Sequence, residues 1–384
     1  MKILLISDCH MRQINGVVTS TLALKSGLTQ LDHDVRVLCP SYSSRFKYEN
    51  RIFGVPSIKT KFIHDDVRIP IPGIAKNIIN RFHEWKPDVV HSQTEFFMMQ
   101  IAFRICQRHN ISLVHTYHTM WTDPQYLNTY TKGLLAEKLI IKHLKGRLER
   151  ANRLIVPTDK TKDLLLGYNV KIPIHVIPSG IEFKEYSDFE KLQIRKSLRR
   201  KFRICDSSKV LIYIGRVSSE KNIEEIIDFA IRVNREDSNI QLVIVGGGKN
   251  IDKFRQLALE LSKDSMSPVK FLGPVPTEEV SKYYLLGDIF VTASTSETQG
   301  ITYFEAMAAG IPVLCRKDSS LNEIIANQRS CYMYNDYLEF SRYCHNLLHS
   351  SDLKRQTADL AIKISKKYSV RRFAESALKV YTNS

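Results

Sequence analysis

Two carboxylates bracket a short polar turn in the second half of the chain. Glu297 and Glu305 lie within residues 296–310, between the apolar runs 289–293 and 311–315. An apolar run, a polar turn, a helical segment and a second apolar run predict a strand–helix–strand unit of a parallel sheet. Ligands bind such sheets in the loops at the carboxyl ends of the strands, where Glu297 would lie. The pattern therefore predicts a ligand-binding loop that carries two acids.

The backbone of this loop suits an anion or a sugar hydroxyl. Gly300 allows a close approach of the main chain to a ligand. The peptide N–H groups of residues 299–302 would point outward at the start of the helix, where no helical carbonyl can accept from them. The candidate ligand-binding residues of the loop are Thr298, Gln299, Gly300, Ile301 and Thr302.

The beginning of the chain is Rossmann-like. An apolar strand at residues 2–7 opens into a loop with the turn signal Asn15-Gly16, and a second strand follows at residues 34–40. The dinucleotide fingerprint G-x-G-x-x-G is absent, which disfavours a dinucleotide. Gly16 either brings backbone N–H groups to a phosphate or is a plain turn glycine, and the residues alone leave both open.

These loops need a scaffold of alternating strands and helices. A chain of 384 residues exceeds one ordinary core. The alternation predicts an α/β protein with two Rossmann-like, doubly wound parallel-sheet domains that face each other across a cleft. We expect a first domain at residues 1–178, a second at 179–365, and a C-terminal helix at 366–384 that crosses back to the first domain. Helices are predicted at 17–31, 74–86, 95–109 and 132–151.

Composition restricts the partners and the compartment. The net charge is +16, and residues 1–180 hold 25 Lys and Arg against 14 Asp and Glu. A basic first half indicates nucleic acid, anionic lipid or a phosphorylated substrate. No recognisable nucleic-acid module is present, and the aromatic residues are not interleaved with basic patches, which disfavours nucleic acid.

No apolar run reaches the ~20 residues of a spanning helix. The start, Met1–Asp8, does not read as a signal peptide. Seven singly scattered cysteines without Cys-x-x-Cys pairs are typical of reduced thiols in a cytosolic protein. The Arg- and Lys-rich stretch at residues 193–203 favours a solvated helical face over an anion-contacting surface.

Five motifs, taken together and in order, resemble one family. They are Asn15-Gly16-Val17, a strand that ends in His118, Gly215-Arg216-x-x-x-x-Lys221, Val243-x-Val245-Gly246-x-Gly248, and Glu297 with Glu305 eight positions later. The combination resembles the large family of retaining glycosyltransferases of the family 4 type, which have the GT-B fold. The resemblance covers essentially the whole chain.

The resemblance implies a role for each motif residue. Arg216 and Lys221 would hold the diphosphate of a nucleotide sugar and neutralise the charge that develops on it. Glu305 would accept hydrogen bonds from the ribose hydroxyls, because two acceptor oxygens suit a vicinal diol. Glu297 would lie beside the donor sugar and its developing positive charge, with His118 also facing that sugar. Taken alone, Glu305 also fits a surface acid, and His118 a structural histidine.

The resemblance implies that no cofactor and no obligatory metal are needed, because the family is generally metal-independent. The triplet Asp32-His33-Asp34 superficially fits an Asp-x-Asp metal motif, but it lies in the turn before the second strand, away from the expected cleft. We interpret it as a polar turn. Two cations on a loop can supply the charge neutralisation that a metal ion supplies elsewhere.

Two stretches are similar to those of bacterial enzymes that glucosylate or galactosylate diacylglycerol lipids. They are Ser-Glu-Thr-Gln-Gly-Ile-Thr at residues 296–302 and, upstream, His115-Thr116-Tyr117-His118-Thr119-Met120-Trp121. Those enzymes typically carry Tyr-Glu-Asp-Tyr after the His-Thr-Met run. This chain has residues 121–126, Trp-Thr-Asp-Pro-Gln-Tyr, instead. The departure falls in the expected acceptor region.

Residues 132–153 predict a basic amphipathic helix that suits an anionic membrane surface. Seven basic residues stand against two acids. An amphipathic helix that only covers a Rossmann sheet is the alternative. Leu135 and Leu139 favour the membrane, because they lie among basic residues where core packing does not need them. The expected membrane and acceptor side comprises Lys132, Leu135, Lys138, Leu139, Lys142, Lys145, Arg147 and Arg150.

The resemblance thus implies a retaining transfer of a hexose, with glucose expected, from a UDP-linked donor to diacylglycerol or a monoglycosyl-diacylglycerol. His118 and Glu297 would be the catalytic residues. The enzyme would be cytoplasmic and peripheral on the inner face of the cell membrane. The alternatives are a soluble, protein or cell-wall acceptor on the same fold and, more remotely, a basic nucleic-acid-binding protein.

Overall fold

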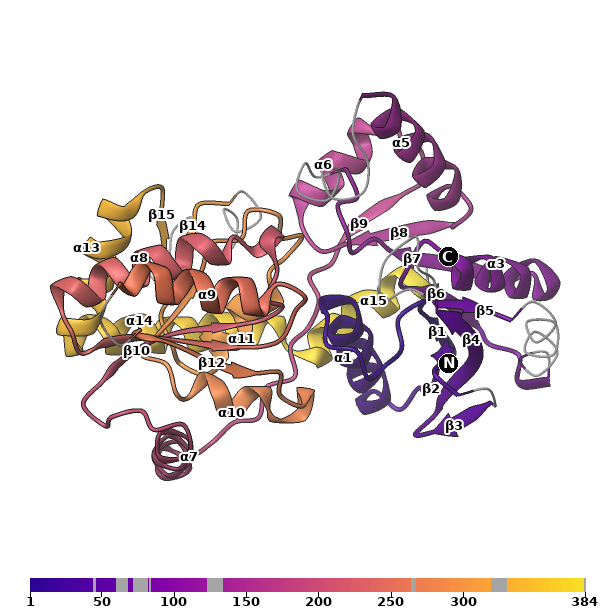
Figure 1. Cartoon of the computed structure of the whole chain (residues 1–384). Coiled ribbons are helices and arrows are strands. Elements are labelled where there is room, and N and C mark those ends of the chain that lie inside the picture. The colour runs from indigo at the N-terminus through magenta and orange to yellow at the C-terminus, as the bar shows by residue number, and fades with distance from the viewer. Residues whose placement is uncertain are drawn as a thin grey trace. The chain divides into compact units, whose positions relative to one another are not determined.

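The computed structural model describes residues 1–43, 46–59, 68–71, 82, 84–122, 134–263, 267–318 and 330–382. The chain forms two compact units (Figure 1). Unit 1 comprises Met1–Glu182 and Tyr368–Ser384, and unit 2 comprises Phe183–Lys367. Residues 179–182 therefore group with unit 1, whereas the sequence placed the boundary after residue 178.

Unit 1 is built on one mostly parallel sheet in the order β3-β4-β2-β1-β6-β7-β8-β9. The strands β3 and β5 both pair antiparallel with β4. The strands are β1 (Lys2–Ile6), β2 (Asp34–Ser41), β3 (Lys47–Glu49), β4 (Ile52–Lys59), β5 (Arg68–Pro70), β6 (Val89–Ser92), β7 (Ser112–Thr116), β8 (Arg153–Val156) and β9 (Ile174–Val176). The helices are α1 (Gly16–Gln30), α3 (Phe97–His109), α5 (Leu134–Leu148), α6 (Asp159–Gly167) and α15 (Val370–Thr382).

The central strand β1 is apolar throughout its inner part because both of its faces are covered. Ile3 and Leu5 pack in one core cluster, and Leu4 and Ile6 pack in another on the opposite face. All four side chains are fully buried. A strand buried on both faces reads as a continuous apolar run, which is why the sequence predicts it correctly.

The C-terminal helix α15 completes unit 1. It lies beside α1 (Figure 1) and buries Phe373, Ala374, Ala377, Val380 and Tyr381 in the cluster that also contains Ile3 and Leu5. The Tyr381 hydroxyl lies 2.7 Å from Nδ1 of the fully buried His91 in β6.

Unit 2 contains a wholly parallel sheet in the order β12-β11-β10-β13-β14-β15. The strands are β10 (Lys209–Ile214), β11 (Ile240–Val245), β12 (Val269–Gly273), β13 (Ile289–Thr292), β14 (Val313–Arg316) and β15 (Cys331–Tyr334). The helices are α7 (Asp188–Lys201), α8 (Ile223–Glu236), α9 (Ile251–Ser262), α10 (Val280–Tyr284), α11 (Ile301–Ala308), α13 (Tyr337–His349) and α14 (Ser351–Ser365). Short 3-10 turns lie at η1 (Ser219–Lys221), η2 (Thr277–Glu279) and η4 (Lys366–Tyr368).

The expectation of a solvated basic face on residues 193–203 is wrong for two of its arginines. Arg195 and Arg199 point from α7 to Asp288, with N–O distances of 3.0 and 3.5 Å. Arg199 is almost fully buried and also donates to the carbonyls of Cys205, Asp206 and Ser208. The pKa of Asp288 is lowered: burial opposes its charge, but Arg195 and Lys354 outweigh that effect.

Most of the helix expected at 74–86 lies outside the described residues. The seven cysteines are free thiols. None of the described helices combines the length and the apolar character needed to cross a bilayer.

Candidate active site

The loops that follow β10 and β11 approach each other closely at the carboxyl edge of the unit 2 sheet. A Cβ atom added at Gly246 would lie 1.8 Å from the carbonyl oxygen of Gly215, and one at Gly248 would lie 1.9 Å from that of Val217. The Val217 N–H donates to the Gly247 carbonyl at 3.0 Å. The two glycines therefore allow the β10 loop, which carries Arg216 and Lys221, to rest on the β11 loop.

The loop after β10 places Lys221 against Glu297 from the loop after the neighbouring strand β13. The Nζ and Oε1 atoms are 2.7 Å apart, and each side chain is 19% exposed. Lys221 ends the turn η1, and Asn222 follows it in the left-handed conformation before α8 begins. The predicted diphosphate cation and the predicted sugar acid are thus in direct contact.

Arg216 lies half-buried in the same loop, and its backbone carbonyl accepts a hydrogen bond from the Tyr213 hydroxyl at 2.7 Å. Asn222 is held to Glu225 of α8, whose carboxylate also accepts from Arg316 at 2.6 Å and from Tyr334 at 3.0 Å. This network ties the end of η1 to the carboxyl ends of β14 and β15. Sequence reasoning did not identify it, because its members are far apart in the chain.

The predicted ligand loop leads directly into α11. Gly300 is the N-cap residue, with a φ of 73°, and no side chain caps the helix. A left-handed φ strains any residue with a Cβ atom, and here that atom would also meet the Tyr303 ring at 2.1 Å. Gln299 is buried, and Thr298, Ile301 and Thr302 are half-buried. The five candidate residues therefore comprise the last three residues before α11 and the first two residues of that helix.

Glu305 lies on α11, one turn beyond the start of the helix. Its Oε2 accepts a hydrogen bond from the buried Tyr284 hydroxyl at 2.7 Å. Burial raises the pKa of Glu305 to about 7, and the Tyr284 hydrogen bond lowers it in part. Glu305 is therefore a half-buried carboxyl that ionises near neutral pH.

His118 lies in unit 1, just beyond β7. Its Nε2 is 2.9 Å from Oε1 of Gln93, which is buried after β6. Burial, aided by the nearby His115, lowers the pKa of His118 to about 3. His118 is therefore neutral at physiological pH, and it can donate or accept a hydrogen bond but supplies no charge.

A buried polar cluster that the sequence did not predict lies beside His118. Asp8 accepts from the Thr94 hydroxyl at 2.6 Å and from the Met98 N–H at 2.9 Å. Burial raises the pKa of Asp8 to about 6. Glu95 lies 3.4 Å from His115 Nε2 and accepts from Trp121 Nε1 at 3.4 Å. The cluster links the ends of β1, β6 and β7 to the segment that carries His118.

Gly16 is the first residue of α1, where Asn15 caps the helix by accepting from the Val18 N–H at 2.9 Å. A Cβ atom added at Gly16 would meet no protein atom within 4 Å. The protein itself therefore imposes no need for glycine at this position.

The basic residues in and just after α5 differ in their exposure and in their hydrogen-bond partners. Lys138 and Lys142 are exposed, and Leu139 between them is 67% exposed. Arg147 instead donates to the Glu95 carbonyl. Arg150, which lies just beyond α5 and is exposed, donates to Gln100 at 2.7 Å. Lys145 forms an ion pair with Glu149 at 3.8 Å. Lys132 and the side chain of Leu135 lie outside the described residues.

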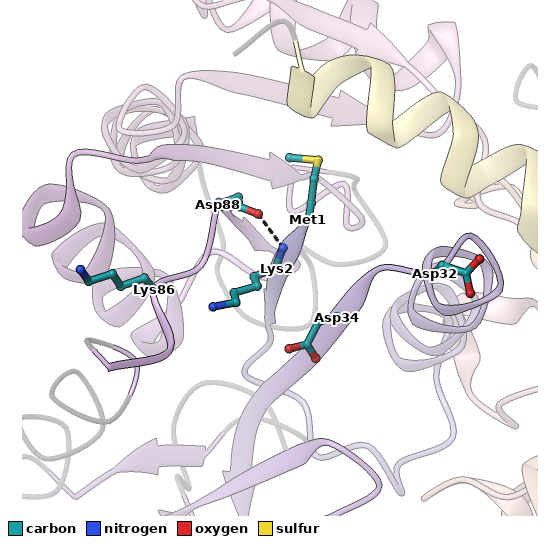
Figure 2. Close-up of a pocket in the computed structure, with 6 residues that line it drawn as sticks. All are labelled: Met1, Lys2, Asp32, Asp34, Lys86 and Asp88. Carbon is teal, nitrogen blue, oxygen red and sulfur yellow. Dashed lines mark hydrogen bonds between the residues drawn. The ribbon is translucent and has the colours of Figure 1, made fainter.

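A pocket of about 550 Å³ lies in unit 1 at the amino ends of β1, β2 and β6. It is lined by Met1, Lys2, Asp32, Asp34, Lys86 and Asp88 (Figure 2). Asp88 accepts from the Lys2 N–H at 2.7 Å. Asp34 accepts from Arg51 at 2.8 Å and from Trp85 Nε1 at 2.9 Å. Asp32 and His33 lie before β2, and Asp34 is the first residue of that strand. Among the described residues, no three His, Cys, Asp or Glu side chains are arranged to hold a metal ion.

The geometry of unit 2 thus combines a cation, two acids and a helix start at the carboxyl edge of a parallel sheet. Lys221 suits an anion, Glu305 suits a diol, and Glu297 suits a developing positive charge. Unit 1, taken by itself, carries His118 as a neutral hydrogen-bonding group.

Comparisons with known proteins define the class of the molecule. Residues 14–185 match the model of Glycosyltransferase Family 4, and residues 194–363 match that of Glycosyl transferases group 1. The fold is similar to Anabaena HepE in complex with UDP and glucose, with a TM-score of 0.76 and 15% identity over the whole of both chains. It is also similar to sucrose-phosphate synthase from Thermosynechococcus elongatus, with a TM-score of 0.79 and 16% identity over 100% of this chain and 99% of that one. The molecule is a glycosyltransferase with the GT-B fold.

Two curated relatives identify the family. The alpha-monoglucosyldiacylglycerol synthase of Streptococcus pneumoniae is 33% identical over 87% of this chain and 75% of its own. The enzyme of that name from Acholeplasma laidlawii is 28% identical over 99% of this chain and 96% of its own. The chain belongs to the family 4 type of glycosyltransferases, with glycolipid synthases among its homologues. The expected fold class and family are confirmed.

Proposed function

We propose that the protein is a retaining hexosyltransferase that moves a hexose, expected to be glucose, from a UDP-linked donor to a membrane lipid. The acceptor is diacylglycerol or a monoglycosyl-diacylglycerol. The observation that carries the donor half is the contact between Lys221 and Glu297 at the carboxyl edge of the unit 2 sheet. The lipid half is supported by the two relatives named as synthases of alpha-monoglucosyldiacylglycerol.

In this proposal each residue acts on one part of the donor. Arg216 and Lys221 bind the diphosphate, and Glu305 accepts hydrogen bonds from the ribose. Gly16 and the N–H groups at residues 299–302 approach the phosphates and the sugar. Glu297 and His118 lie beside the sugar, where Glu297 stabilises the positive charge that develops as the bond to the diphosphate breaks.

The acceptor hydroxyl then attacks from the face that the diphosphate leaves. The bond between the anomeric carbon and the diphosphate oxygen breaks, the bond to the acceptor oxygen forms, and the leaving diphosphate takes the acceptor proton. The configuration is retained, and no metal ion is required because Arg216 and Lys221 neutralise the leaving group.

The acceptor would be reached at a membrane surface. Leu139 with Lys138 and Lys142 on α5 presents an exposed apolar side chain between two cations, which suits an anionic bilayer. We therefore propose that the enzyme is cytoplasmic and binds the inner face of the cell membrane peripherally.

A donor-by-acceptor panel tests the proposal. The purified chain is incubated with UDP-glucose, UDP-galactose or GDP-mannose and with diacylglycerol, monoglucosyl-diacylglycerol or a soluble sugar, with and without EDTA. We expect mass spectrometry to show a hexosyl lipid from a UDP donor, undiminished by EDTA, and NMR to show an α-linkage. Products on the soluble acceptor alone would overturn the lipid half, and loss of product in EDTA would overturn metal independence.

A further inference from the structure

Tyr284 is a buried tyrosine that contacts the candidate ribose-binding acid. It ends the short helix α10 and is fully buried, and its ring centroid lies 5.8 Å from that of Phe290 in β13. Its hydroxyl lies 2.7 Å from Oε2 of Glu305 and 3.3 Å from the Thr302 carbonyl oxygen. The position of this hydroxyl is therefore set by packing in the core and by two acceptors on α11.

The two oxygens of Glu305 have different surroundings. Oε2 accepts the Tyr284 hydrogen bond, whereas Oε1 has no hydrogen-bond partner among the residues that the structure describes. A carboxylate can accept several hydrogen bonds, so Oε1 and the remaining lone pair of Oε2 are available to a ligand. A rotating carboxyl would lose conformational freedom when a diol binds, and the Tyr284 contact removes much of that freedom beforehand.

We propose that Tyr284 is a positioning residue for ribonucleotide recognition: its hydroxyl fixes Glu305 through Oε2 and directs Oε1 to the vicinal diol of the ribose. This inference rests on the proposed function, in which Glu305 accepts hydrogen bonds from the ribose. The inference adds Tyr284 as the residue that holds Glu305 in the orientation and in the ionised form that a diol requires.

The hydroxyl also favours ionisation of Glu305. Burial raises the Glu305 pKa to about 7, and donation from Tyr284 opposes that rise because a hydrogen bond stabilises the charged form. A ligand that donates two hydroxyl groups binds the carboxylate better than the acid. We therefore expect affinity for a ribonucleotide to fall about tenfold per pH unit below pH 7 and to reach a plateau above it.

The elements packed against α11 supply no competing charge at Glu305 among the described residues. The buried face of α14 consists of Thr357, Ala361, Ile364 and Ser365, none of which ionises near neutral pH. Lys354 of α14 bonds to Asp288, and Arg316 of β14 bonds to Glu225. Within α11 the other ionisable group is the buried Tyr303, and from α10 Tyr284 itself makes the contact. The Glu305 pKa is thus governed by burial and by Tyr284.

The substitution Tyr284→Phe tests the assignment, because it removes one oxygen atom and keeps the ring. Calorimetric titration of the whole chain with UDP, and with GDP in parallel, is carried out from pH 6 to 9. Wild type is compared with Tyr284→Phe, with Glu305→Gln, and with Tyr283→Phe as the matched control on the same helix. Glu305→Gln reports the pH dependence that comes from the diphosphate and other groups.

We expect Tyr284→Phe to weaken binding about tenfold at pH 7, the loss of one hydrogen bond to a charged group. The pH at which affinity reaches its plateau should rise by about one unit, with most of the affinity regained at pH 9. Tyr283→Phe should follow wild type. A merely structural role of Tyr284 would weaken binding equally at every pH.

The possible failures can be distinguished. If neither nucleotide binds the wild type, or if Glu305→Gln binds with unchanged affinity and pH dependence, the proposed ribose site itself is wrong. If Glu305→Gln loses the pH dependence but Tyr284→Phe keeps the wild-type plateau, the ribose site stands and the role of Tyr284 is overturned. A loss in Tyr284→Phe that is uniform from pH 6 to 9 also overturns the positioning role.

Discussion

Lys221 and Glu297 form an ion pair with each other, yet in the proposed mechanism each acts on a different charge of the donor. Their 2.7 Å contact is only partly exposed, so removing either partner leaves a poorly solvated charge in the site. When a diphosphate approaches, Lys221 gains a second anionic partner, and Glu297 can turn to the sugar. In that proposed mechanism the pair would couple diphosphate binding to the electrostatics around the reacting carbon.

Single substitutions of this pair are expected to damage catalysis strongly. Lys221→Ala or Glu297→Ala should each reduce turnover by more than tenfold, a loss of more than ~1.4 kcal/mol of transition-state stabilisation. Because the residues are in contact, the double variant should lose less than the sum of the single losses. Steady-state rates on the best donor and acceptor measure this. Lys253→Ala, which breaks the surface pair with Glu224, is the matched control. Near wild-type rates in both site variants would contradict the assignment.

The ionisation of Glu305 affects the stability of the folded protein. Its folded pKa of about 7 lies above the ordinary value of 4.5, so ionisation in the folded protein is opposed by burial. This penalty is absent below pH 4.5, grows as the pH rises toward 7, and is complete above it. Glu305→Gln should therefore raise the melting temperature of the nucleotide-free protein at pH 8 and change it little at pH 5. Equal melting curves of the two proteins at pH 8 would argue against a raised pKa.

At the scale of single elements, α5 shows what a helical pattern can and cannot indicate. The pattern places Leu139 outside the core, and its side chain is exposed, whereas Leu144 and Leu148 of the same helix are buried. It treats the basic residues alike, whereas Arg147 and Arg150 bond to the region around α3. A helical wheel assigns a residue to a face but does not identify the tertiary partners that a long arginine side chain reaches.

The exposed part of α5 gives a direct test of membrane contact. The triple variant Lys138→Gln, Leu139→Gln, Lys142→Gln removes two charges and one apolar side chain from the surface. Binding to liposomes rich in anionic lipid should fall by tenfold or more, since each basic residue contributes about 1 kcal/mol at such a surface. Cosedimentation measures the bound fraction. Leu259→Gln, on an exposed leucine of α9, is the control. Undiminished cosedimentation of the triple variant would show that α5 is not the contact.

At the scale of the whole molecule, the alternation of strands and helices is sufficient to predict both parallel sheets. Lys221 is identified by its resemblance to a family motif, and its contact with Glu297 depends on the strand order, in which β10 neighbours β13. Tyr284, Gln93 and the Glu225 network do not follow from it. Their contacts depend on how helices pack on the sheets, and no local spacing encodes that packing.

The role of α15 in unit 1 can be tested at one atom. Tyr381→Phe removes the hydroxyl that bonds to the buried His91, whose other nitrogen bonds to Thr116 at 2.7 Å. An unpaired polar nitrogen in the core should lower the free energy of unfolding by about 1–3 kcal/mol. Urea denaturation measures this loss, and Tyr332→Phe in unit 2 is the control. A change of less than about 0.5 kcal/mol would show that the hydrogen bond adds little to the stability of unit 1.

The helix α15 belongs to unit 1 but follows unit 2 in the sequence. The two units can therefore complete their folding at different stages of synthesis. Unit 2 is one continuous segment, Phe183–Lys367, and all of it has left the ribosome before α15 appears. Unit 1 exposes the apolar surface of Ile3, Leu5 and Leu28 until Phe373 and Tyr381 arrive to cover it. The first half of the chain to be translated is therefore the last to acquire its complete core, and it is the half that nascent-chain chaperones would have to protect.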